Sequence, residues 1–213
     1  MKQNLVDVRF NSQSATIPLP HNRYIDKVLR SNSYEELMWR FKDADSPSKE
    51  ISESYAAFSN LKKLCIINNF NWLHIGDGGH TRTAAIFAFF SKTINFSIDP
   101  ALNMEKFVAW KEKYNIERIQ PLMCKFEEVS TLTDVVPREP YSITCVHAHV
   151  KLEEVDKYYP NWVYLYSNIC CYPSRQTFSE EYMKEHNIVK IVEKLDLGIS
   201  SPERRIVIYK KLK

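Results

Sequence analysis

Glycine and long apolar stretches are the scarcest features of this sequence. Only four of its 213 residues are glycine, and three of those four lie between positions 76 and 79. No apolar run approaches the about 20 residues that a membrane-spanning helix needs, and residues 1–10 lack the apolar core of a signal peptide. We therefore expect a cytoplasmic protein without a membrane partner.

Paired cysteines and a strong charge of either sign are also missing. The five cysteines form an odd set with no CxxC spacing, which favours reduced thiols over a disulfide framework. Lys and Arg number 29 against 26 for Asp and Glu, so the net charge is only +3. This balance permits an anionic partner such as nucleic acid without requiring one. With 44% hydrophobic and 26% charged residues, the composition is that of a globular protein and excludes disordered and collagen-like classes.

The first 46 residues differ in pattern from the rest. Pro18 and Pro20 each remove a backbone donor, so we expect irregular chain there, with a short helix near residues 34–41. We interpret residues 1–46 as an N-terminal arm or lid. Ser46 and Pro47 form a helix-start signal, and the apolar spacing that follows predicts one long helix ending near residues 68–69. Residues 47–213 would then form a single domain.

From position 71 onward, short apolar runs alternate with helical segments, which is typical of a layered α/β sheet. The pattern predicts strands at 71–75, 93–98, 119–126, 141–146 and 162–166, and helices at 81–90 and 104–114. Two further strands, 189–195 and 205–210, are separated by too few residues for a crossover helix, so they must be antiparallel neighbours. The prediction is a mostly parallel seven-stranded sheet with an antiparallel C-terminal hairpin.

The glycine-rich loop after the first of these strands is the most informative segment. Gly76, Gly78 and Gly79 let the backbone turn sharply and approach a ligand, and the following helix presents unpaired N–H groups. Asp99 ends the next strand about 20 residues later, where an acid can accept both hydroxyls of a ribose. The alternative is a plain strand-to-helix turn, with Asp99 serving only as the cap of the helix near Met104.

These features resemble the class I S-adenosylmethionine-dependent methyltransferases. The resemblance rests on the glycine-rich loop, Asp99 and the terminal hairpin, and it covers roughly residues 47–213. It implies an α/β fold of the Rossmann-like three-layer sandwich type, S-adenosylmethionine as the cofactor, and cofactor binding across the carboxyl ends of the first strands. The residues that it assigns to cofactor binding are Gly76, Asp77, Gly78, Gly79 and Asp99, with Phe126 beside the adenine.

The segment after the fourth strand departs from the family. It carries His147 and His149 in place of the Asn/Asp-Pro-Pro-aromatic or Asp patterns of many members. If the strand continued, the spacing of two would point both imidazoles the same way, and either could be the catalytic general base. Structural hydrogen bonding at the sheet edge is the alternative role of both histidines.

Cys170 and Cys171 follow the fifth strand, so one thiolate could join both histidines as zinc ligands. Adjacent cysteines rarely bind one ion together, and we expect buried small hydrophobes and no metal site. The sequence therefore predicts a methyltransferase of unknown acceptor, with RNA or another nucleic acid favoured. The alternative is an inactive methyltransferase-like protein that serves as a binding module. A nucleotide-sugar or dinucleotide enzyme is disfavoured because G-x-G-x-x-G spacing is absent.

Overall fold

The computed structural model describes residues 3–10, 13–129 and 140–212. Its centre is a seven-stranded sheet in the order β5-β4-β3-β6-β7-β9-β8. The strands are β3 (Asn71–Ile75), β4 (Asn95–Ile98), β5 (Ile119–Leu122), β6 (Tyr141–Val146), β7 (Trp162–Asn168), β8 (Ile188–Leu195) and β9 (Arg205–Lys211). β3 to β7 run parallel, whereas β9 is antiparallel to both β7 and β8. This confirms the predicted mostly parallel sheet and its C-terminal hairpin.

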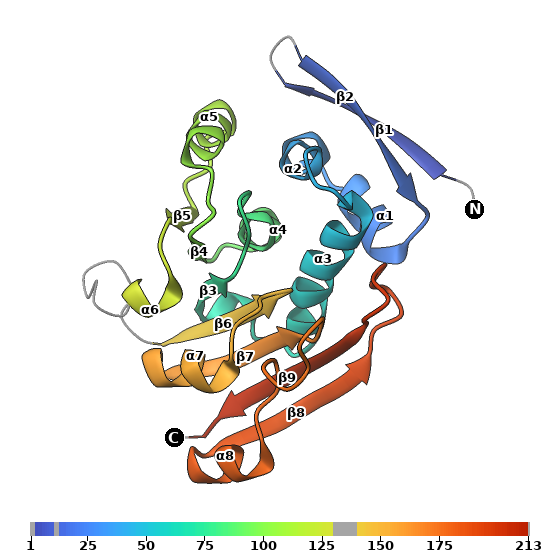
Figure 1. Cartoon of the computed structure of the whole chain (residues 1–213). Coiled ribbons are helices and arrows are strands. Elements are labelled where there is room, and N and C mark those ends of the chain that lie inside the picture. The colour runs from blue at the N-terminus through green and yellow to red at the C-terminus, as the bar shows by residue number, and fades with distance from the viewer. Residues whose placement is uncertain (1–2, 11–12, 130–139, 213) are drawn as a thin grey trace.

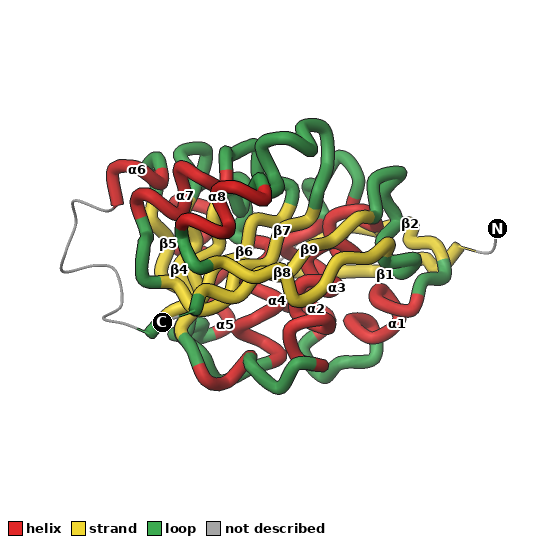
Figure 2. Tube along the Cα trace, turned by 90° about the horizontal axis from the view of Figure 1, so that it is seen from below, coloured by secondary structure: helices red, strands yellow, loops and turns green. Residues whose placement is uncertain are grey.

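Helices cover both faces of the sheet and complete a three-layer sandwich (Figure 2). One face carries α1 (Arg23–Leu29), α2 (Tyr34–Phe41), α3 (Pro47–Lys63), α4 (Arg82–Phe90) and α5 (Met104–Tyr114). The other carries α6 (Phe126–Val129), α7 (Leu152–Tyr158) and α8 (Glu180–Glu185). Each layer has its own apolar core, one centred on α3 and α4 and the other on α7 and the inner strands.

The long helix α3 begins at Pro47 after Ser46, as predicted, but it ends at Lys63 rather than near residues 68–69. Cys65 adopts a left-handed φ of 59°, which a helix cannot continue through, and a short 3-10 turn (Ile67–Asn69) leads into β3. Apolar residues on the inner side of α3 pack against α4. The rings of Phe58 and Phe87, for example, meet edge to face at 5.6 Å.

The short helix predicted around residues 34–41 is confirmed as α2, but the prediction that residues 1–46 are otherwise irregular is wrong, because they also contain α1 and two strands. Residues 3–20 contain a two-stranded antiparallel ribbon of β1 (Gln3–Phe10) and β2 (Gln13–Pro20), which lies beside α2 in Figure 1. Pro18 and Pro20 are two residues apart, so their missing N–H groups fall on the same edge of β2. An isolated ribbon leaves one edge of each strand unpaired, and this is where a sheet tolerates proline.

The end of one strand and the presence of two short helices also differ from the sequence prediction. The strand expected over residues 119–126 ends at Leu122, and the last of those positions, Phe126, opens the helix α6. Helices α7 and α8 were not expected, because each has only seven or six residues and so shows little helical periodicity. None of the helices in the described ranges has the length and apolar character needed to cross a bilayer.

Candidate functional site

A cavity of about 640 Å³ opens over the carboxyl ends of β3, β4 and β6. The order of the sheet reverses between β3 and β6, and such a switch point is where open α/β sheets bind ligands. The strand ends contribute residues 75–78, 98–100 and 146–150, and residues 125–127 close one side. The first turns of α3 supply the opposite wall. The volume lies within the range of small-molecule and cofactor sites.

Two of the loop glycines adopt left-handed backbone angles, with φ of 68° at Gly76 and 72° at Gly78. A Cβ at Gly76 would lie 2.7 Å from Cβ of Ala148, so this glycine permits close packing against the loop after β6. A Cβ at Gly78 would meet nothing within 4 Å, and Gly78 lines the cavity. Gly79 is not among the lining residues; its carbonyl instead accepts the N–H of Asn103 at 3.0 Å.

The carboxylate of Asp77 is turned toward helix α4. Its oxygens accept the N–H groups of Thr83 (2.7 Å) and Ala84 (3.1 Å), and Ser97 donates its hydroxyl at 2.8 Å. Asp77 thus replaces the usual cap of α4, because Thr81 at the N-cap makes no side-chain hydrogen bond. Burial raises the pKa of Asp77 to about 6, while these donors oppose the shift. Asp77 lines the cavity, but its side chain is used to hold the loop on α4.

Asp99 lies at the tip of β4 and joins it to the glycine-rich loop. One carboxylate oxygen accepts the N–H of Gly78 at 2.9 Å, and the other accepts the N–H of Ala101 at 2.8 Å. Each oxygen therefore retains acceptor capacity, and Asp99 is one of the residues that line the cavity. Asp99 does not cap α5, because the side chain of Asn103 performs that role by accepting the N–H of Lys106. The capping alternative for Asp99 is thereby wrong.

His147 and His149 both line the cavity, although not by the route that the sequence suggested. The strand β6 ends at Val146, and His147 takes a left-handed φ of 54°. The two imidazole centroids are 5.2 Å apart. Burial is the main cause that lowers the pKa of each histidine, which favours the neutral form of both rings.

Helix α3 supplies polar side chains that sequence reasoning missed. Nζ of Lys49 lies 3.4 Å from Nε2 of His147. Glu53 is buried, which raises the pKa of its carboxyl group, and the charges of Lys49 and His147 oppose that rise. On α4, Arg82 pairs with Glu50, and burial lowers the pKa of its guanidinium to about 10. One feature of the sequence could have indicated these residues. Positions 49, 50 and 53 are charged, although the apolar spacing of the same helix predicts that it packs against the core.

Unsatisfied polar atoms gather at this cavity. Among the described residues, five buried side-chain nitrogen or oxygen atoms have no hydrogen-bond partner, and three of them belong to lining residues: Oε1 of Glu53, Nε of Arg82 and Nδ1 of His147. Buried polar atoms are nearly always paired in folded proteins. The concentration of exceptions in one place indicates that the cavity holds a polar ligand.

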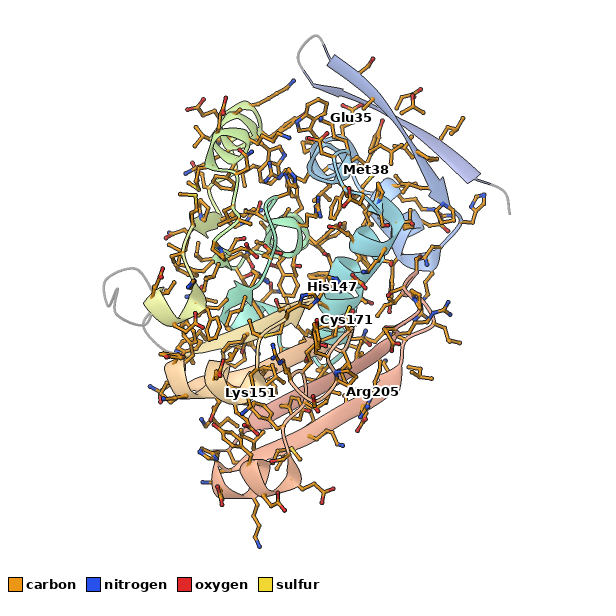
Figure 3. The ribbon with its side chains drawn as sticks, in the orientation of Figure 1. Glu35, Met38, His147, Lys151, Cys171 and Arg205 are labelled. Carbon is orange, nitrogen blue, oxygen red and sulfur yellow. The ribbon has the colours of Figure 1, made fainter. Side chains whose placement is uncertain are left out.

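The lining is also unbalanced in charge, with six acidic and three basic side chains. Phe126 adds an aromatic surface to the lining, and its ring packs edge to face against the ring of Tyr158 at 5.8 Å. At the mouth, the exposed ring of Tyr172 meets the ring of His149 at 5.4 Å. Figure 3 shows His147 and Cys171 at the end of the sheet that faces α3. The site therefore combines acidic walls with aromatic and imidazole groups.

The sequence matches no protein-family model and no curated protein. Solved structures match the fold. MtNAS in complex with MTA and tNA aligns with a TM-score of 0.54 and 11% identity over 89% of this chain and 69% of that one. Magnesium protoporphyrin IX methyltransferase from Synechocystis PCC 6803, with bound SAH, gives 0.53 and 9% identity over 87% and 97%. A SAM-dependent methyltransferase from Leishmania major gives 0.51 and 13% over 88% and 82%. The chain has the class I methyltransferase fold.

Proposed function

We propose that this protein is an S-adenosylmethionine-dependent methyltransferase and that the cavity over β3, β4 and β6 binds the cofactor. The observation that carries the proposal is the contact between the ends of β3 and β4, where Asp99 accepts the N–H of Gly78. Both residues line the cavity, and the carboxylate of Asp99 can accept further hydrogen bonds. When bound, the cofactor supplies an electrophilic methyl group on a sulfonium sulfur. The acidic lining suits the positive charge of that sulfonium.

The lining residues divide the cavity into regions of different chemistry. Asp99 offers carboxylate oxygens to a ribose, and Phe126 offers an apolar ring to an adenine. Arg82, with its unsatisfied Nε, offers a cation to the carboxylate of a methionine group. The unsatisfied Nε of Arg82 thus has a chemically matched partner in this ligand.

His147 and His149 follow β6, which lies on the other side of β3 from β4 and Asp99. We assign both histidines to the acceptor side of the cavity. Their neutral rings can accept a proton from the incoming nucleophile, because a free lone pair is required for general base catalysis. Beside them, the guanidinium carbon of Arg175 lies 5.4 Å from the ring centre of Tyr172. An exposed aromatic ring with an arginine suits the stacking of an unpaired base, so we favour a nucleic-acid acceptor.

Calorimetric titration with S-adenosylmethionine and with its demethylated product tests the cofactor assignment. Asp99→Ala should weaken binding by about 1–3 kcal/mol, or roughly 5- to 150-fold, because hydrogen bonds to a charged acceptor are lost. Asp7→Asn is a matched control, since Asp7 is an exposed acid on β1 outside the cavity. Absence of heat from both ligands with the folded protein would refute the proposal.

An inactive binding module is the second candidate function. It is favoured by one observation, namely that the segment after β6 carries histidines where many active members have an Asn/Asp-Pro-Pro-aromatic motif. Transfer of a labelled methyl group to single-stranded RNA and DNA separates the two candidates. Cofactor binding without transfer to nucleic acid, protein or small-molecule acceptors would favour the binding module.

A further inference from the structure

Two histidines and one cysteine from different strands meet at the mouth of the cavity. His147 and His149 follow β6, and Cys170 follows β7. These strands are parallel neighbours, so their carboxyl ends lie side by side. One ligand atom from each of the three residues lies within 4.8 Å of the other two. In the described parts of the chain, no other cluster of histidine, cysteine and acidic residues approaches this closely.

The state of each side chain suits a metal ligand. Nδ1 of His147 is buried and has no partner, and it can bind a metal ion in the tautomer that carries the ring proton on Nε2. Nζ of Lys49, 3.4 Å from Nε2, must then turn away from the ring, because both groups would be donors. His149 is exposed, so its ring can rotate toward an ion. Cys170 is buried and reduced, while the adjacent Cys171 is exposed and is not part of the cluster. The left-handed φ of His147 is a conformation that a non-glycine residue rarely adopts, and such strain is concentrated at functional sites.

A fully buried glutamine holds the two ligand segments together. Nε2 of Gln176 donates to the carbonyl of Ala148 at 2.6 Å and to Sγ of Cys170 at 3.0 Å. Its Oε1 accepts the N–H of Cys170 at 2.7 Å. Ala148 lies between the two histidines in sequence, so this one amide fixes the histidine segment relative to the thiol. Hydrogen bonds of this kind orient metal ligands and stabilise a thiolate.

Negative charge is also available beside the cluster. Glu53 is buried, one of its carboxylate oxygens lacks a partner, and its charge acts on His147. A carboxylate near a ligating imidazole is a common outer partner in zinc sites. It also offsets part of the charge that a divalent cation would bring near Lys49.

We propose that His147, His149 and Cys170 form a binding site for one Zn²⁺ ion at the acceptor side of the cavity. Two imidazoles and one thiolate are a ligand set that Zn²⁺ prefers, and tetrahedral coordination needs ligand atoms about 3.5 Å apart. The exposed ring of His149 can close the remaining gap. Three protein ligands leave a fourth position, which is open to water or to an acceptor atom, as in catalytic zinc sites. With the ion bound, the ring lone pairs of both histidines serve coordination, so the histidines are available as a general base only in the metal-free protein.

The experiment measures metal binding directly and contains no methyl donor, so its outcome is independent of the proposed function. Protein purified under reducing conditions is assayed for bound zinc by elemental mass spectrometry. The chelator-treated protein is then titrated with Co²⁺. We expect about one zinc ion per chain and a thiolate-to-cobalt charge-transfer absorption. Cys170→Ser should abolish that absorption, and His149→Ala should weaken metal binding more than about 100-fold.

Two further variants separate coordination from general effects. Gln176→Ala should weaken Co²⁺ binding by about 10- to 100-fold, as expected for the loss of an outer hydrogen-bond partner. Cys171→Ser retains a neighbouring buried thiol and should bind Co²⁺ as the unchanged protein does. Because His149 is exposed, its removal leaves the fold intact, and a thermal unfolding curve checks this. Absence of zinc together with absence of the cobalt absorption overturns the proposal, as does an undiminished absorption in Cys170→Ser.

Discussion

The buried carboxylate of Asp77 gives the protein a pH-dependent stability that can be worked out from the structure. Burial raises its pKa from 3.8 to about 6. A raised folded-state pKa means that the folded protein binds the proton more tightly than the unfolded chain does. The contribution is therefore fully present below about pH 4 and is lost as the pH rises through about 6. A shift of about two units corresponds to about 3 kcal/mol.

Urea unfolding of the unchanged protein and of Asp77→Asn, measured between pH 4 and 7, isolates this contribution. The amide cannot titrate. As the pH rises from 4 to 7, the free energy of unfolding of the unchanged protein should therefore fall by about 2–3 kcal/mol relative to that of Asp77→Asn. Ser97→Ala is an informative companion, because the Ser97 hydroxyl opposes the raised pKa of Asp77. Its removal should move the transition to higher pH. A difference that stays constant from pH 4 to 7 would refute the reasoning.

Two other predictions concern the stability of the fold. Gly76→Ala should destabilise the protein by more than Gly78→Ala, because both substitutions strain a left-handed backbone by about 1–2 kcal/mol but only the first also forces a Cβ into the loop after β6. Chemical denaturation of the two variants measures this, and equal losses would contradict it. Asp196→Ala should cost about 2–4 kcal/mol, because it leaves the buried donors of Tyr24 (2.6 Å) and Asn60 (2.7 Å) without their acceptor. Thermal unfolding tests it, and a shift of only a degree or two would contradict it.

The sheet was predictable because its signals are local. The strand expected at 71–75 and the helix start at Pro47 agree with the structure, since each rests on a few neighbouring residues. The C-terminal hairpin was predictable from the length of its connection alone. In contrast, the N-terminal ribbon contradicts the local rule that proline interrupts a strand. Proline removes a backbone N–H group, and this disrupts a strand only where that group would have paired with a neighbouring strand.

The part of the site that α3 contributes could not be predicted from the sequence, for a different reason. Lys49 and Glu53 are almost 100 positions before His147, and only the packing of α3 on the strand ends brings them together. Asp77 showed the opposite limitation. The sequence placed it correctly in the loop, but only the structure reveals that its carboxylate faces the N-terminus of α4.

The loop after β6 is the element in which the two halves of the site depend on each other. Ala148 packs against Gly76 on one side, so closely that no Cβ fits, and its carbonyl accepts from Gln176 on the other. The histidines on either side of it are therefore fixed relative to both the glycine-rich loop and Cys170. A larger residue at position 76 would displace His147 as well as the glycine-rich loop. The glycine at position 76 thus meets a specific requirement, namely that two loops approach each other at the strand ends.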